Sequence, residues 1–144
     1  MGEDTPSNLE VVPALNHTIV WCTNRQRGAA HVVEVLGIEA PREFAGQFLV
    51  VEMGNGVSLD YADWPGDEIT PQHLAFLVSE DEFDAIYGRI KAKAIDHWAD
   101  PSKQTRSEIN HHDGGRGVYW NDPDGHLLEI ITRPYGAETE GSGG

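Results

Sequence analysis

The sequence has little of several features that mark particular classes of protein. It has one cysteine, Cys22, so it forms no internal disulfide and suits a reducing compartment. It has 10 Lys and Arg against 24 Asp and Glu, a net charge of −14. This balance argues against nucleic acid or an anionic membrane as a partner, because both need a basic surface. No apolar run approaches the length of a membrane span.

The first ten residues, MGEDTPSNLE, carry neither a basic segment nor an apolar one, so they do not resemble a signal peptide. We therefore expect a cytoplasmic protein. A chain of 144 residues is long enough for one domain with a buried core. We expect a polar lead-in over 1–13, a single domain over 14–135 and a disordered tail over 136–144.

A predicted β-hairpin dominates the C-terminal part of the chain. Its turn is Asn121 to Gly125, in which Pro123 fixes one backbone angle and the final Gly supplies a positive φ. The strand that follows places Glu129 between apolar neighbours. Burying an unpaired carboxylate costs several kcal/mol, so the fold must bring Glu129 a positive partner.

The order of predicted elements occurs twice along the chain, which indicates an internal repeat. Each half begins with a strand and a helix and continues with further strands. The expected strands lie at 15–22, 47–53, 57–62, 72–78, 97–98, 117–120 and 126–132, with helices after Thr23 or Asn24 and after Ser79. We predict an α+β fold of two βαβββ modules, about 14–63 and 71–135. They would form a curved mixed sheet around a metal or ligand cavity.

Four polar side chains occupy equivalent places in the two halves. His17 and His73 are each the third residue of their segments, LNHTIVW and PQHLAFL. Asp60 and Glu129 each follow a turn glycine by four residues. Two histidines and one carboxylate suit Fe(II) with open coordination positions, and Mn(II), Zn(II) or Ni(II) would accept the same ligands. The alternative is that each His is a hydrogen-bonded core residue and that Glu129 pairs with a loop Arg such as Arg116.

These elements and the segment GVYWNDPDGHLLEIITRPYG resemble the vicinal oxygen chelate superfamily over about 15–135. That superfamily includes glyoxalases, extradiol ring-cleaving dioxygenases, fosfomycin-modifying enzymes and metal-free bleomycin-sequestering proteins. The resemblance implies a metal held by His17, His73 and Glu129, with Asp60 at the variable fourth place.

A narrower resemblance involves the spacing from Asn110 to Glu129. It is similar to the motif of extradiol dioxygenases, which implies that His112 is an acid–base group and that Tyr119 is a hydrogen-bond donor to substrate. We therefore expect an Fe(II) extradiol-type dioxygenase that acts on a small catechol-like aromatic. The residues that would line its substrate site are Ile19, Trp21, Ala75, Leu77 and Arg116.

Two other functions are compatible with the same residues. A glyoxalase- or isomerase-like lyase would use the symmetric set, with one carboxylate beside the metal acting as a base. A metal-free protein of the bleomycin-resistance type would bind a drug in an acidic groove. In each case we expect a homodimer with a small-molecule ligand, and the metal site either lies within one chain or is shared between two.

Overall fold

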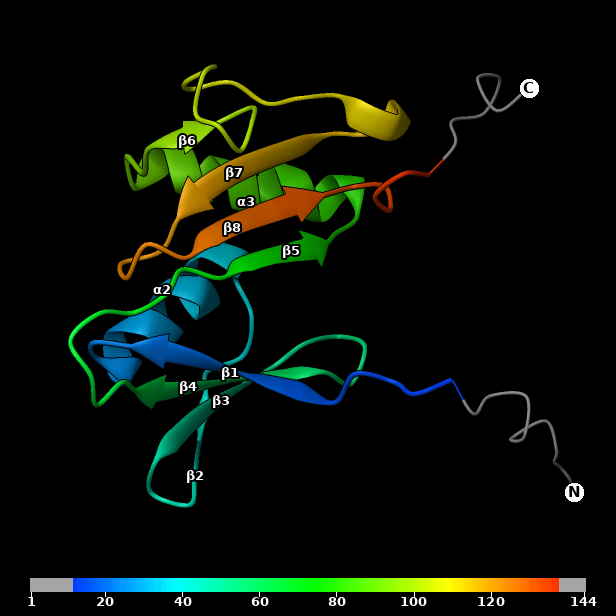
Figure 1. Cartoon of the computed structure of the whole chain (residues 1–144). Helices are drawn as coiled ribbons and strands as arrows, with labels where there is room; N and C mark the ends of the chain where they lie inside the picture. Colours follow the sequence, from blue (N-terminus) through cyan, green and yellow to red (C-terminus); the bar gives the residue numbers. More distant parts are fainter. Residues whose placement is uncertain (1–11, 138–144) are drawn as a thin grey trace, which may run out of the picture.

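The computed structural model describes residues 12–137 and contains the repeated order of elements (Figure 1). The expected lead-in and tail lie mostly outside these residues. The first half contains β1 (His17–Cys22), α2 (Arg25–Leu36), β2 (Arg42–Phe44), β3 (Phe48–Glu52) and β4 (Ser58–Asp63). The second half contains β5 (His73–Leu77), α3 (Glu80–Ala92), β6 (His97–Trp98), the 3-10 turn η1 (His112–Gly114), β7 (Gly117–Asn121) and β8 (Leu127–Ile131).

Each half forms its own four-stranded mixed sheet, which confirms the α+β class and the duplication. The strand orders are β1-β4-β3-β2 and β5-β8-β7-β6, and the first pair in each order is parallel. In the paired strands Asp60 lies beside Ile19, as Glu129 lies beside Ala75, so the two carboxylates are equivalent. The sheets do not join into one curved sheet within the described chain, and β1 and β5 are both edge strands.

Local sequence signals set the ends of both helices. The side chain of Asn24 accepts a hydrogen bond from the backbone N–H of Arg27, and α2 ends at Gly37 in the left-handed conformation. Ser79 and Glu82 form a reciprocal capping box at the start of α3, with N···O distances of 2.8 and 3.1 Å. These caps position the two helices on one face of each sheet.

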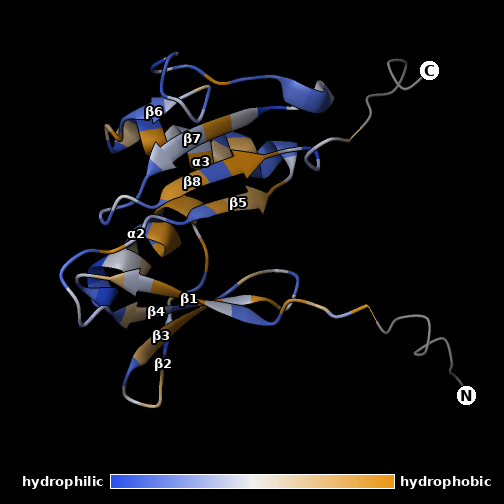
Figure 2. Ribbon diagram, in the orientation of Figure 1, coloured by the Kyte–Doolittle hydropathy of each residue, from blue (hydrophilic) through white to orange (hydrophobic). Residues whose placement is uncertain are grey.

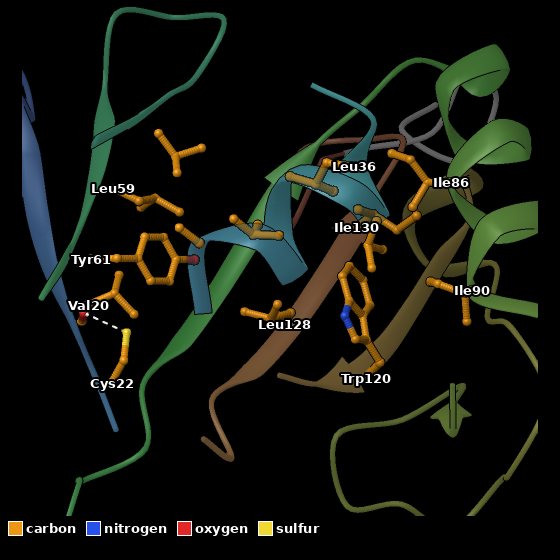
Figure 3. Packing of buried hydrophobic residues seen from close by; sticks show 14 of the residues in the cluster. Val20, Cys22, Leu36, Leu59, Tyr61, Ile86, Ile90, Trp120, Leu128 and Ile130 are labelled. Carbon is orange, nitrogen blue, oxygen red and sulfur yellow. Dashed lines mark hydrogen bonds between the residues drawn. The ribbon is translucent and has the colours of Figure 1, made fainter. Parts of the chain in front are cut away.

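The core joins the two halves through α2. Its apolar side chains pack on one side against the first sheet, near Tyr61, and on the other against Leu128 of the second sheet (Figure 3). Cys22 is fully buried in this core, and burial raises the pKa of its thiol to about 12, so it is a packing residue. In Figure 2 the apolar residues gather along α2, α3 and the strands that face them. The opposite faces of both sheets carry the polar side chains predicted to bind metal.

A fully buried histidine also ties the halves together. His126 accepts a hydrogen bond at Nδ1 from the backbone N–H of Gln72 and donates from Nε2 to the carbonyl of Trp21, both at 2.9 Å. The ring therefore links the end of β1 to the residue before β5. This role could not be predicted, because a single His after a turn glycine has no partner that is visible in the sequence.

A second link between the halves predicts a pH dependence of stability. The indole N–H of Trp120 donates to Nε2 of His31 at 3.0 Å, and burial lowers the pKa of that imidazole. A His with a lowered pKa binds fewer protons in the folded state than in the unfolded state. Its contribution to the free energy of unfolding is therefore complete above its ordinary pKa and is lost as the pH falls below it. We expect the free energy of unfolding, measured with urea, to fall as pH drops below about 6.5. The loss should be smaller in His31→Leu; an equal loss in both proteins would contradict this role.

No helix within residues 12–137 is long and apolar enough to cross a membrane.

Candidate metal and substrate site

The second sheet brings two of the predicted metal ligands together. His73 is at the start of β5 and Glu129 is in the middle of the adjacent parallel strand β8. Nε2 of His73 lies 3.0 Å from Oε1 of Glu129. Glu129 is only 8% exposed, whereas the side chain of His73 is half exposed. The hydrogen-bonding partner of the buried carboxylate is therefore His73.

The hydrogen bonds of His73 leave its Nε2 directed at a carboxylate. Nδ1 lies 3.0 Å from the carbonyl of Leu127, which can only accept, so Nδ1 carries a proton. Metal-binding histidines are typically oriented by such a bond to a backbone carbonyl. A proton or a metal cation must then lie between Nε2 and Oε1. Two ligand atoms that each lie about 2.1 Å from one octahedral ion, with an angle of about 90° between the two bonds, are about 3.0 Å apart. The separation of Nε2 and Oε1 therefore fits a shared divalent metal.

Tyr119 completes the surroundings of Glu129. It pairs with Glu129 across β7 and β8, and its ring stacks on the imidazole of His73 with centroids 6.1 Å apart. Burial raises the pKa of Tyr119 to about 12, and its hydrogen bond to Glu129 and the charge of that carboxylate add to the effect. The phenol therefore stays protonated and acts as a hydrogen-bond donor at neutral pH.

A cavity of about 490 Å³ adjoins this cluster and is lined by Tyr119, Glu129 and His112, among others. This volume lies in the range of small-molecule sites. His112 is exposed at the beginning of η1. His112 and Tyr119, the two residues of the predicted motif, thus line the same cavity as the carboxylate of Glu129.

Asn110 holds this loop, a role that the sequence analysis did not assign. Its amide N–H donates to the carbonyl of Ala99 at 2.8 Å, and its Oδ1 accepts from the backbone N–H of His112 at 3.2 Å. A Cβ at Gly117 would lie 2.9 Å from Oδ1 of Asn110, so the close approach requires glycine there. The only signal in the sequence was the position of Asn110 inside the motif.

His17 and Asp60 lie on the first sheet, apart from this cluster. His17 is exposed, and its Nδ1 lies 2.6 Å from Oδ1 of Asn16, which leaves Nε2 available. Asp60 accepts a hydrogen bond from the hydroxyl of Ser58 at 2.9 Å. Across residues 12–137, no three His, Cys, Asp or Glu side chains are grouped so that they could hold a metal ion. Of the predicted ligands, His73 and Glu129 are therefore adjacent within the described chain, whereas His17 is on the other sheet.

Arg116, predicted to line the substrate site, lines the cavity that contains Tyr119 and Glu129, and it also contacts α3. Its guanidinium donates to Glu80 and Asp84 of α3, each at 2.8 Å, and lies over the ring of Phe83. These bonds raise the pKa of Arg116, the bond to Asp84 most of all. The carboxylate of Glu129 is paired with His73 and not with this arginine.

The expected apolar wall residues lie on two sheets. Ile19 and Trp21 share the face of His17 on β1, whereas Ala75 and Leu77 share the face of His73 on β5. Leu77 is 61% exposed, and it lines, with Ala75, a second cavity of about 490 Å³ between β5 and the first half. Each pair thus lies on the same sheet face as its own histidine, and the two pairs are on different sheets of the chain.

Comparisons with known proteins agree with this arrangement. A family model described as Glyoxalase/Bleomycin resistance protein/Dioxygenase superfamily matches residues 14–130. The solved structure of the oxidase ChaP-H1 is 54% identical, with a TM-score of 0.84 over 88% of this chain and 100% of its own.

Two transferases are also similar to this chain. The glutathione transferase FosA of Serratia marcescens is 28% identical over 124 residues, 83% of this chain and 81% of that enzyme. The metallothiol transferase FosB of Shouchella clausii (strain KSM-K16) is 37% identical over 60 residues, 42% of this chain and 37% of that enzyme. The matched residues and the duplicated modules show that the chain belongs to the glyoxalase/bleomycin resistance protein/dioxygenase superfamily.

Proposed function

We propose that the chain is an Fe(II)-dependent extradiol-type dioxygenase that acts on a catechol-like aromatic. The observation that carries the proposal is the 3.0 Å approach of His73 to Glu129, beside Tyr119 and a cavity lined by His112. His73 and Glu129 would hold the ion together with His17. When bound, Fe(II) supplies a Lewis acid with open positions for two vicinal oxygens and for O₂.

The protein groups around the ion have separate tasks. Glu129 balances the charge of the metal, and the carbonyl of Leu127 orients the ring of His73. Tyr119, whose raised pKa keeps the phenol protonated, would move its hydrogen bond from Glu129 to a substrate oxygen. His112, an imidazole in the same cavity, would accept a proton from the substrate hydroxyl and later return it.

A second copy of the chain would supply the missing ligand. The edge strands β1 and β5 each carry one of the two histidines, and each has one side without a strand partner within the described chain. Open edges next to exposed Leu15 and Leu77 favour coverage by another protein surface. We infer a symmetric homodimer in which His17 of one protomer completes the site that His73 and Glu129 begin in its partner.

Similar proteins support redox and metal chemistry. ChaP-H1, at 54% identity, is named an oxidase. FosX of Listeria monocytogenes, which shares the fold at 19% identity, was crystallised as a variant with Mn(II). Among the metals that fit the ligand set, Fe(II) is the one that reacts with O₂ in sites of two histidines and a carboxylate.

Oxygen uptake tests the proposal directly. Protein purified without oxygen and loaded with Fe(II) should consume O₂ with at least one member of a panel of substituted catechols. The product should show the absorbance of a ring-cleaved compound, and Tyr119→Phe should lower kcat. If no catechol of a broad panel supports O₂ uptake in iron-loaded protein, the dioxygenase proposal is wrong.

The symmetric position of Asp60 keeps a lyase as a second candidate. Asp60 occupies the place in the first sheet that Glu129 occupies in the second, so it could be a fourth ligand or a base. Under the dioxygenase proposal, Asp60→Ala should retain iron and most of the oxygen uptake. Loss of metal, or of proton exchange at a carbon beside a substrate carbonyl, would instead favour the lyase.

A further inference from the structure

One cross-strand row of the first sheet contains three aromatic residues around an alanine. In the registered strands Trp21 lies beside Ala62, Ala62 beside Phe48, and Phe48 beside Phe44. The row lies on the same face of the sheet as His17, because four residues separate His17 from Trp21 along β1. The small side chain between two rings leaves a hollow in this face.

The dimensions of the hollow suit one flat ring. Adjacent strands are about 4.8 Å apart, so the strands that carry Trp21 and Phe48 are about 10 Å apart, with Ala62 between them. An aromatic layer in contact with a ring on each side needs about 7–8 Å. A cavity of about 200 Å³ is present here, lined by Trp21, Phe48, Ala62 and Arg25. We name this cavity the aromatic slot.

Neighbouring side chains fix the walls of the aromatic slot. Trp21 meets Trp64 edge to face, with ring centroids 5.1 Å apart, and Phe48 meets Phe44 at 6.5 Å. Because each wall ring has its own support, the slot is preformed and does not need to be built by the ligand.

A charged side chain also lines the aromatic slot. Arg25 is held by Asp63, with Nη1 2.7 Å from Oδ2, while its backbone N–H donates to Oδ1 at 2.8 Å. The planar guanidinium is therefore fixed at the wall of the slot, where it can contact the face or edge of an aromatic ligand.

We propose that the aromatic slot binds one ring of a planar, multi-ring phenol or quinone, and that this compound is the substrate class. Its identity as the substrate rests on the proposed function, since the assembly that brings His17 to the metal also brings this face into the site. His17 and Trp21 are about 13 Å apart along the strand. A single ring chelated at the metal spans part of that distance, whereas two or three fused rings span it.

Binding to metal-free protein tests the aromatic slot separately from catalysis. Equilibrium dialysis of EDTA-treated full-length chain should show that 1,2-dihydroxyanthraquinone binds at least about tenfold more tightly than catechol, because added rings gain stacking and buried area. Ala62→Leu, which fills the slot, should remove that preference. Ala85→Leu makes the same change on the exposed surface of α3 and should leave the affinity unchanged.

Arg25→Lys gives a second variant if Ala62→Leu does not fold. It keeps the positive charge beside Asp63 but removes the planar guanidinium that lines the slot, so the affinity for the three-ring compound should fall about threefold to tenfold. Equal affinity of the original chain for catechol and 1,2-dihydroxyanthraquinone would contradict the proposal that the slot binds a ring. So would unchanged affinity for the three-ring compound in both variants. Absence of O₂ uptake alongside intact three-ring binding would instead contradict only the proposed function.

Discussion

Glu129→Gln is expected to abolish iron binding and oxygen consumption while the fold is retained. The substitution keeps the shape of the side chain but removes the negative charge that faces Nε2 of His73 at 3.0 Å. An amide N–H can then donate to that nitrogen, which blocks the lone pair that the metal needs. Loss of even an outer hydrogen-bond partner of a metal ligand lowers metal affinity or activity about 10- to 100-fold. We therefore expect the affinity for iron to fall more than about 100-fold in Glu129→Gln.

Elemental analysis and O₂ uptake measure the two effects on the same sample. Glu52→Gln is the matched control, since Glu52 is an exposed carboxylate paired with Arg42 at 2.9 Å and lies on the first sheet. The control should retain iron and activity. If Glu129→Gln keeps a full complement of iron, the pair of His73 and Glu129 is only an internal ion pair, and the metal site has been misplaced.

His17→Ala is expected to reduce iron binding as severely as His73→Ala does. Within one chain this result would be surprising, because His17 is exposed, bonds to Asn16 and lies on the other sheet from Glu129. It follows from a site completed by a second copy, in which both histidines contact one ion. His111→Ala is the control, since His111 is an exposed loop residue with no role in the proposed site. Normal iron content in His17→Ala would remove His17 from the ligand set.

Sequence patterns predicted the parts of this molecule that depend on short-range chemistry. The helix starts after Asn24 and Ser79 and the turn before Glu129 all appear where expected. The equivalence of Asp60 and Glu129 also holds, because strand register has a strict period of two and the two turns set the same offset.

Other features depend on tertiary contacts that no local pattern records. β2 has only three residues, all exposed, so it carries no periodic signal. The choice of Glu80 and Asp84 as partners of Arg116 depends on where α3 docks. The separation of the two ligand-bearing faces arises because α2 packs between the sheets, and hydrophobic periodicity alone does not specify that arrangement.

The central claim is that one metal site contains residues from two copies of the chain. Co-refolding equal amounts of His17→Ala and His73→Ala tests it, because each homodimer has two damaged sites. In a mixed dimer one site carries both substitutions and the other carries none. With random pairing, about one quarter of all sites are then intact, so iron content and oxygen uptake should recover to about 25% of the original protein. If the mixture stays as inactive as its components although mixed dimers have formed, the site does not combine His17 and His73 across two chains.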